Sequence, residues 1–135
     1  MSNTYIWIQL LEKDKIKFSN PLGDWMKEKF PGIERFDFDN YSEQFIVDHV
    51  IDHAATAEKL IVTIDAVENT ETGPVTRFMN RLVRMKVTKL VILNGHNALI
   101  QKMTDVFDQK DILTNPGFIR SKEAIINFLE NYPGL

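Results

Sequence analysis

The stretch LIVTIDAVENTETGPVTRF, residues 60–78, joins an apolar segment to a helical pattern through a polar loop. Its first five residues are aliphatic or β-branched, which is typical of a strand that is covered on both faces of a sheet. Asp65 follows this strand directly. Pro74 then precedes Val75 and Phe78, whose spacing predicts a helix with proline at its start. The stretch therefore predicts one strand-loop-helix unit.

The same alternation recurs along the chain. The expected strands are TYIWIQLL (4–11), IERFDFD (33–39), KLIVTIDA (59–66), KLVILNG (89–95) and DILT (111–114). A helical pattern follows each strand. The expected caps are Ser19 or Asn20 for the first helix and Ser121 for the last, and the second helix is expected to run from Ser42. The residues expected to face the core are Leu22, Trp25, Met26, Phe30, Phe45, Ile46, Val50, Ile51, Ala54, Val75, Phe78, Met79, Leu82, Val83, Leu99, Ile100, Met103, Val106, Phe107, Ala124, Ile125, Phe128 and Leu129.

Five such units predict a three-layer α/β/α sandwich, a parallel sheet with helices on both faces. The charged segment 33–39 is typical of an edge strand, which gives the order 2-1-3-4-5 of the flavodoxin-like arrangement. We expect residues 1–135 to form a single domain. A second hypothesis has residues 13–15 turning an initial hairpin with residues 15–18. The second half, down to SKEAIINFL, then resembles anti-sigma-factor-antagonist domains, but the segment 21–39 fits that family poorly.

Composition excludes several classes of function. The chain has 135 residues, 44% hydrophobic and 26% charged, and no apolar run near the ~20 residues that a membrane span needs. Its net charge of -3 argues against general nucleic-acid binding. With no cysteine, disulfides, thiolate catalysis and Cys-ligated zinc are excluded. The first residues are typical of a strand rather than of a signal peptide, so we expect a cytoplasmic protein.

Any site is expected at the carboxyl ends of the strands, where open parallel sheets bind ligands. Asp65 and His96 lie there and form the candidate acid-base pair. Asp, Asn, Gly and Thr are also common in strand-to-helix loops for structural reasons, and on that interpretation Asp65 accepts hydrogen bonds from the amides of residues 67–70. The other edge candidates, for a small polar ligand, are Glu68, Asn94, Gly95, Thr114 and Asn115, and Glu12 ends the first strand.

Two families resemble parts of this edge. Asp65 stands where a response-regulator receiver has its aspartate, but LLEKDK offers only Glu12 and Asp14 for magnesium, and LTNPG lacks the lysine. The loop DAVENTETG is similar to the acidic loop of nucleoside deoxyribosyltransferases, whose carboxylates bind ribose and supply a nucleophile. That resemblance covers about a tenth of the chain, and Arg77 stands where the family has a glutamate.

No cofactor or metal is expected. The chain has no P-loop, no G-x-G-x-x-G and no G-x-S-x-G, and EKDKIKFSN is charged where a flavin phosphate loop is rich in Ser, Thr and Gly. His49 and His53 are four residues apart and would be neighbours on a helix, but a third ligand is missing.

Two functional hypotheses remain. The first is a non-enzymatic regulatory or protein-interaction module, which we favour because no complete catalytic constellation is readable. Arg77, Arg81 and Arg84 share one helix face and predict an acidic partner or a second copy of the chain, and the weak fifth strand also favours a homodimer. The second is a small enzyme for a nucleoside- or sugar-like metabolite, with Asp65 and His96 as catalytic groups.

Overall fold

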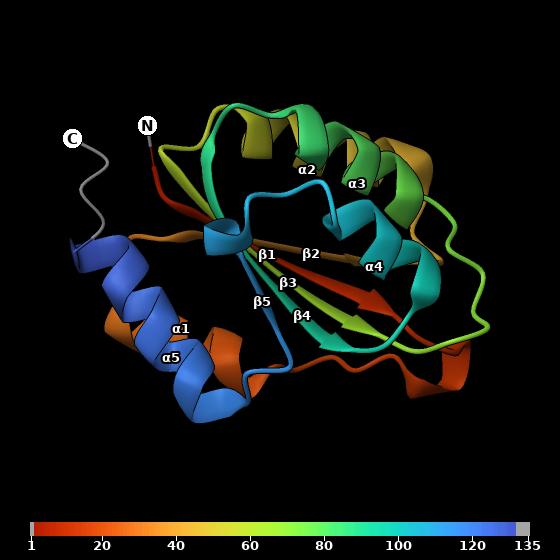
Figure 1. Ribbon diagram of the computed structural model, residues 1–135, viewed down its shortest axis with the longest axis horizontal. Coiled ribbons are helices and arrows are strands. Elements are labelled where there is room, and N and C mark those ends of the chain that lie inside the picture. The colour runs from red at the N-terminus through yellow and green to blue at the C-terminus, as the bar shows by residue number, and fades with distance from the viewer. Residues whose placement is uncertain (1, 132–135) are drawn as a thin grey trace.

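The computed structural model describes residues 2–131 and contains one sheet of five parallel strands (Figure 1). The strands lie in the order β2-β1-β3-β4-β5. This confirms the predicted order and the flavodoxin-like α/β sandwich. The strands are β1 (Thr4–Leu10), β2 (Glu34–Asp39), β3 (Lys59–Ala66), β4 (Thr88–Gly95) and β5 (Ile112–Thr114).

The helices cover both faces of the sheet. In Figure 1, α1 and α5 lie on one face and α2, α3 and α4 on the other. None of the helices within residues 2–131 has both the length and the apolar character to cross a membrane. Their bounds are α1 (Pro21–Lys29), α2 (Gln44–Ala55), α3 (Val75–Arg84), α4 (Ala98–Thr104) and α5 (Phe118–Ile126). The short 3-10 helices are η1 (Lys13–Lys15) and η2 (Gln109–Asp111), and the π-helix η3 (Asn127–Asn131) continues α5.

The strand side chains alternate between two cores. Toward α2, α3 and α4, the inner strands present almost only aliphatic groups, and Phe78 of α3 packs there against Phe38 of β2 with ring centroids 5.2 Å apart. Toward α1 and α5, the strands present Tyr5 and Trp7 beside aliphatic residues such as Ile61. The two faces therefore differ in polarity although the same strands build them.

The edge strand and the chain after β1 show that the initial hairpin does not form. β2 pairs only with β1 among residues 2–131, and it carries charged side chains as predicted. Residues 13–15 form the 3-10 turn η1, and residues 16–18 form no strand, so the hairpin hypothesis is wrong. The chain instead crosses over to α1, whose N-cap is Asn20, as predicted.

Some helix expectations were wrong. Phe45 and Ile46 of α2 are exposed, and Val47 is buried instead. Phe45 precedes Val47 by two residues, which puts it on nearly the opposite side of the helix. Leu99 and Val106 are also exposed. α5 begins at Phe118, three residues before the expected cap Ser121, whose hydroxyl lies inside the helix and donates to the Gly117 carbonyl.

Candidate functional site

The polar groups of the carboxyl edge lie mainly on the α1 and α5 side of the sheet. Along β1, Tyr5, Trp7 and Gln9 alternate with isoleucine and so point to this side. Asp65 of β3 and Asn94 of β4 are cross-strand neighbours at the same edge. The sheet therefore brings together side chains with polar tips from three strands.

Asp65 is held by two side chains. Its Oδ2 accepts a hydrogen bond from Trp7 Nε1 at 2.8 Å, and its Oδ1 accepts one from Asn94 Nδ2 at 3.0 Å. The expected donors, the loop amides of residues 67–70, do not bond to it, and that expectation was wrong. Parallel pairing sends β3 and β4 to the same edge, so a neighbouring strand supplies a donor before the loop does. Asp65 therefore links β1, β3 and β4.

A second group of hydrogen bonds lies beside the first. The Tyr5 hydroxyl lies 2.6 Å from Thr63 Oγ1 and accepts a bond from Asn20 Nδ2 at 2.7 Å. The Asn20 Oδ1 atom caps α1 by accepting from the Leu22 amide. Burial raises the pKa of Tyr5 to about 12, so its hydroxyl stays protonated at neutral pH. These bonds join β1 and β3 to the start of α1.

His96 forms its side-chain hydrogen bond with Glu68 and not with Asp65. Its Nδ1 lies 2.8 Å from Glu68 Oε1, and the same oxygen accepts from the Ala98 amide at the start of α4. No hydrogen bond joins His96 to Asp65 among the interactions of the described residues. The two candidate catalytic groups are thus bonded to different neighbours.

Two of the remaining edge candidates, Gly95 and Asn115, connect the loops that follow β4 and β5. Asn115 Oδ1 accepts from the Gly95 amide at 2.7 Å, and Asn115 Nδ2 donates back to the Gly95 carbonyl at 3.3 Å. Gly95 has a φ of +83°, and a Cβ there would lie 2.0 Å from the Ala66 carbonyl oxygen, so only glycine fits. Thr114 ends β5 and is exposed, and Glu12 is exposed just before η1.

A cavity of about 250 Å³ opens between the first turns of α1 and α5. Its polar lining groups supply carboxylate, amide and hydroxyl groups, which suit a small polar ligand. His96 does not line it. Its lining residues are Asn20, Pro21, Leu22, Thr63, Asp65, Asn94, Gly117, Phe118 and Ser121.

The histidine pair of α2 forms an aromatic cluster. The centroid of the His53 ring lies 4.6 Å from the centroid of the His49 ring and 4.7 Å from that of the Phe36 ring. His53 Nδ1 is 3.8 Å from Glu34 Oε2. Within residues 2–131, no three His, Asp or Glu side chains are arranged to hold a metal ion.

The arginine ridge of α3, Arg77, Arg81 and Arg84, is exposed as expected. Arg77 Nε binds Asp48 Oδ1 of α2 at 2.9 Å. This hydrogen bond, together with one from Gln44, lowers the pKa of Asp48. Helices α2 and α3 are therefore linked at the surface by an ion pair.

Sequence interpretation missed the side chains that hold Asp65 and the start of α1, namely Trp7 and Tyr5. The signal was present, because Tyr, Trp and Gln occupy alternate positions of β1 and isoleucine or leucine the others. The chain matches no protein-family model and no curated protein, so the geometry carries the functional interpretation.

Proposed function

We propose that this protein is a non-enzymatic regulatory or protein-interaction module. One observation carries the proposal: the edge groups that sequence suggested for catalysis are bonded to neighbours in the chain. Asp65 binds Trp7 and Asn94, and His96 binds Glu68. A general base and acid would have to converge on one substrate atom, and these two groups are directed to separate structural partners.

Exposed apolar side chains support recognition of another protein. Of the nine large ones among residues 2–131, eight lie at the carboxyl edge, in loops that follow the strands or in the first turns of helices, and Val106, which follows α4, is the exception. When a partner covers such side chains, apolar surface is removed from water, and this favours association. The eight at the carboxyl edge are Phe18, Tyr41, Phe45, Ile46, Val67, Leu99, Phe118 and Ile119.

The partner that fits best is a second copy of the chain, bound through α2 and α3. The exposed side of α2 carries Asp52 and the apolar Phe45, and the neighbouring α3 carries Arg81 and Arg84. Across a two-fold axis, α2 of one protomer faces α3 of its partner, so acidic and basic groups meet twice. Among the described residues, these two arginines and Asp52 have no ion pair within their own protomer.

The enzyme hypothesis ranks second. The cavity beside Asp65 and Asn94 favours it, because a metabolite of nucleoside or sugar size carries hydroxyls that these groups can bind. The bonds of His96 to Glu68 argue against the acid-base pair it would need. For either function we propose the cytoplasm as the site of action, since the chain has no cysteine.

Paired charge reversals test the homodimer. One variant carries Arg81→Glu and Arg84→Glu, so both facing helices are acidic in its homodimer; the other carries Asp52→Arg, so both are basic. We expect light scattering to give a dimer for the parent protein and monomers for each variant alone. A mixture of the two variants should form a heterodimer, because acidic then faces basic at both contacts.

Two outcomes contradict this proposal. A parent protein that stays monomeric at high micromolar concentration rejects self-association. A dimer that neither variant disturbs places the interface elsewhere. Asn80→Asp, a change at another exposed position of α3, is the matched control and should leave the mass of the parent dimer unchanged.

A further inference from the structure

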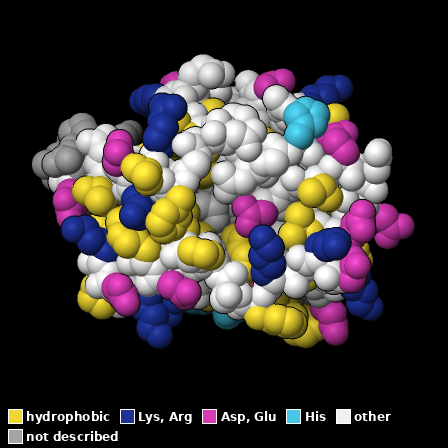
Figure 2. All heavy atoms as spheres, turned by 90° about the horizontal axis from the view of Figure 1, so that it is seen from below, with side chains coloured by type: hydrophobic (Ala, Val, Ile, Leu, Met, Phe, Trp, Pro, Cys, Tyr) yellow, Lys and Arg dark blue, Asp and Glu magenta, His cyan; other side chains and the backbone are white. Residues whose placement is uncertain are grey.

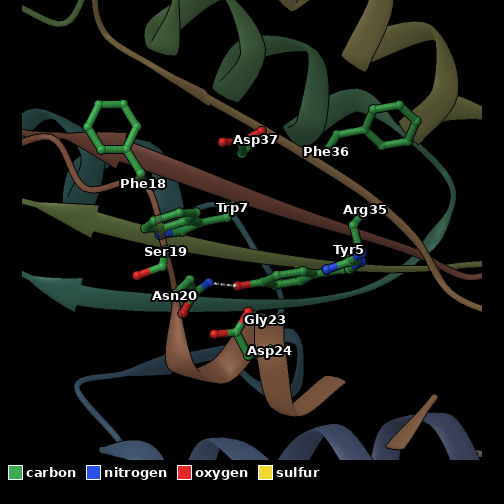
Figure 3. A pocket seen from close by; sticks show the side chains of 10 residues that line it. All are labelled: Tyr5, Trp7, Phe18, Ser19, Asn20, Gly23, Asp24, Arg35, Phe36 and Asp37. Carbon is green, nitrogen blue, oxygen red and sulfur yellow. Dashed lines mark hydrogen bonds between the residues drawn. The ribbon is translucent and has the colours of Figure 1, made fainter. Parts of the chain in front are cut away.

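A second cleft lies on the same side of the sheet, between β2 and the start of α1, with a volume of about 320 Å³ (Figure 3). Trp7 and Tyr5 of β1 line its floor, and Arg35 and Asp37 of β2 line one wall. Asn20, which also lines the cavity beside Asp65, separates the two. No sequence pattern pointed to this cleft.

The aromatic floor is held in one orientation. The Trp7 indole donates to Asp65, and the Tyr5 hydroxyl bonds to Thr63 and Asn20. Both rings are nearly buried, so they give the cleft a rigid apolar base. A ligand that binds there does not have to order these side chains, which lowers the entropic cost of binding.

The wall carries charges of both signs that lack partners. Arg35 and Asp37 are two residues apart on the same side of β2. In the strand register, Arg35 pairs with Tyr5 and Asp37 with Trp7. Neither forms an ion pair or a side-chain hydrogen bond within residues 2–131, and neither does Asp24 on α1. Figure 2, which views the molecule from the α1 and α5 side, shows basic, acidic and hydrophobic side chains in both halves of this face, with the largest hydrophobic group in its left half.

The loop before α1 presents an apolar side chain at the rim. Gln9, which is buried, bonds through both side-chain polar atoms to the backbone of Lys17, and Tyr5 anchors Asn20. Phe18 lies between these anchors and is fully exposed, and it lines the cleft. Two buried polar side chains therefore fix a loop that holds a phenylalanine in water.

We infer that this cleft binds a small zwitterion of the α-amino-acid type with an apolar side chain. Arg35 takes its carboxylate, Asp37 its ammonium group, and the apolar side chain packs on Trp7 and Phe18. Residues two apart on a strand are separated by about 7 Å. The two charged groups of an α-amino acid are about 3 Å apart and, with a hydrogen bond of about 2.8 Å at each end, span about 8–9 Å, and the long side chain of Arg35 supplies the extra reach. The inference does not depend on the proposed homodimer.

A helix glycine lines the cleft beside the N-cap of α1. Gly23 is buried in α1 and lines the cleft, although glycine inside a helix costs about 1 kcal/mol relative to alanine. A Cβ at this position would lie only 3.3 Å from Nδ2 of Asn20, so glycine leaves the N-cap side chain and its hydrogen bond to Tyr5 undisturbed.

Calorimetric titration of the full chain with three matched probes tests the inference. L-phenylalanine carries both charges, phenethylamine lacks the carboxylate and 3-phenylpropionate lacks the ammonium group. We expect L-phenylalanine to bind at least about tenfold more tightly than either of the others, because each loses one charge-assisted hydrogen bond. Arg35→Met should weaken the binding of L-phenylalanine by at least about tenfold and leave the affinity for phenethylamine unchanged.

Phe18→Ser should weaken the binding of all three probes. The variant should still fold, since Phe18 is exposed. The matched control is Arg84→Met on α3, across the sheet, which should change no affinity. Three results overturn the inference: no binding of L-phenylalanine at about 10 mM, equal binding of phenethylamine and L-phenylalanine, or binding that Arg35→Met does not affect.

Discussion

The two faces of the sheet are built from the same strands and serve different purposes. Toward α2, α3 and α4, the side chains of the inner strands are aliphatic and close-packed. Toward α1 and α5, Tyr5, Trp7 and Asp65 end in polar atoms that are bonded across strands. Both clefts described above open on this second side. Close packing on the aliphatic face, here called the dry face, stabilises the fold. The other face, here called the polar face, can therefore hold polar groups in fixed positions.

The dry face should respond most strongly to a cavity. Phe78 is fully buried and packs on Phe38, so Phe78→Ala should lower the free energy of unfolding by about 3–5 kcal/mol. Urea denaturation measures this loss. Val83→Ala, on the same helix but half-buried, is the control and should cost clearly less. Equal losses would mean that Phe78 does not carry the packing of this face.

The polar face should respond to high pH through Tyr5. Its pKa is raised to about 12 from 10.0, mainly by burial, so the folded state holds this proton more tightly than the unfolded chain does. The resulting stability is fully present below pH 10 and is lost as the pH rises through about 12. Its full value is at most about 2–3 kcal/mol.

Comparison of the parent with Tyr5→Phe isolates this contribution, because every other titrating group is shared. We expect the variant to be less stable at pH 8 and to lose less stability between pH 10 and 12. Parallel pH profiles of the two proteins would show that the Tyr5 hydroxyl titrates normally in the fold.

Asp65→Asn should give a smaller loss. The amide keeps one acceptor oxygen, so either Trp7 or Asn94 loses its acceptor, at about 1–3 kcal/mol. Glu71→Gln, which changes an exposed carboxylate on the same loop after β3, is the matched control and should cost less. Thermal unfolding measures both, and a metabolite binding screen run alongside it tests the enzyme hypothesis. Unchanged stability with loss of a parent ligand would favour the enzyme over the module.

The sequence by itself determined the fold. The alternation of apolar strands with amphipathic helices predicted the parallel sheet, and the charges of residues 33–39 predicted which strand lies at the edge. These features follow from local periodicity and from the cost of burying charge, so they are readable along the chain. The positions of Asp65, Asn94 and His96 at the carboxyl edge were readable for the same reason.

Only the tertiary structure decided which side chains meet. Trp7 and Asp65 are far apart in the sequence, and strand register and the tilt of two side chains bring their atoms to 2.8 Å. The same applies to Arg35 and Phe18, which line one cleft because β2 pairs with β1 and Gln9 holds the loop. Hydrogen bonds act over about 3 Å, so periodicity places a residue on a face and an edge, and only the packed chain selects its partner.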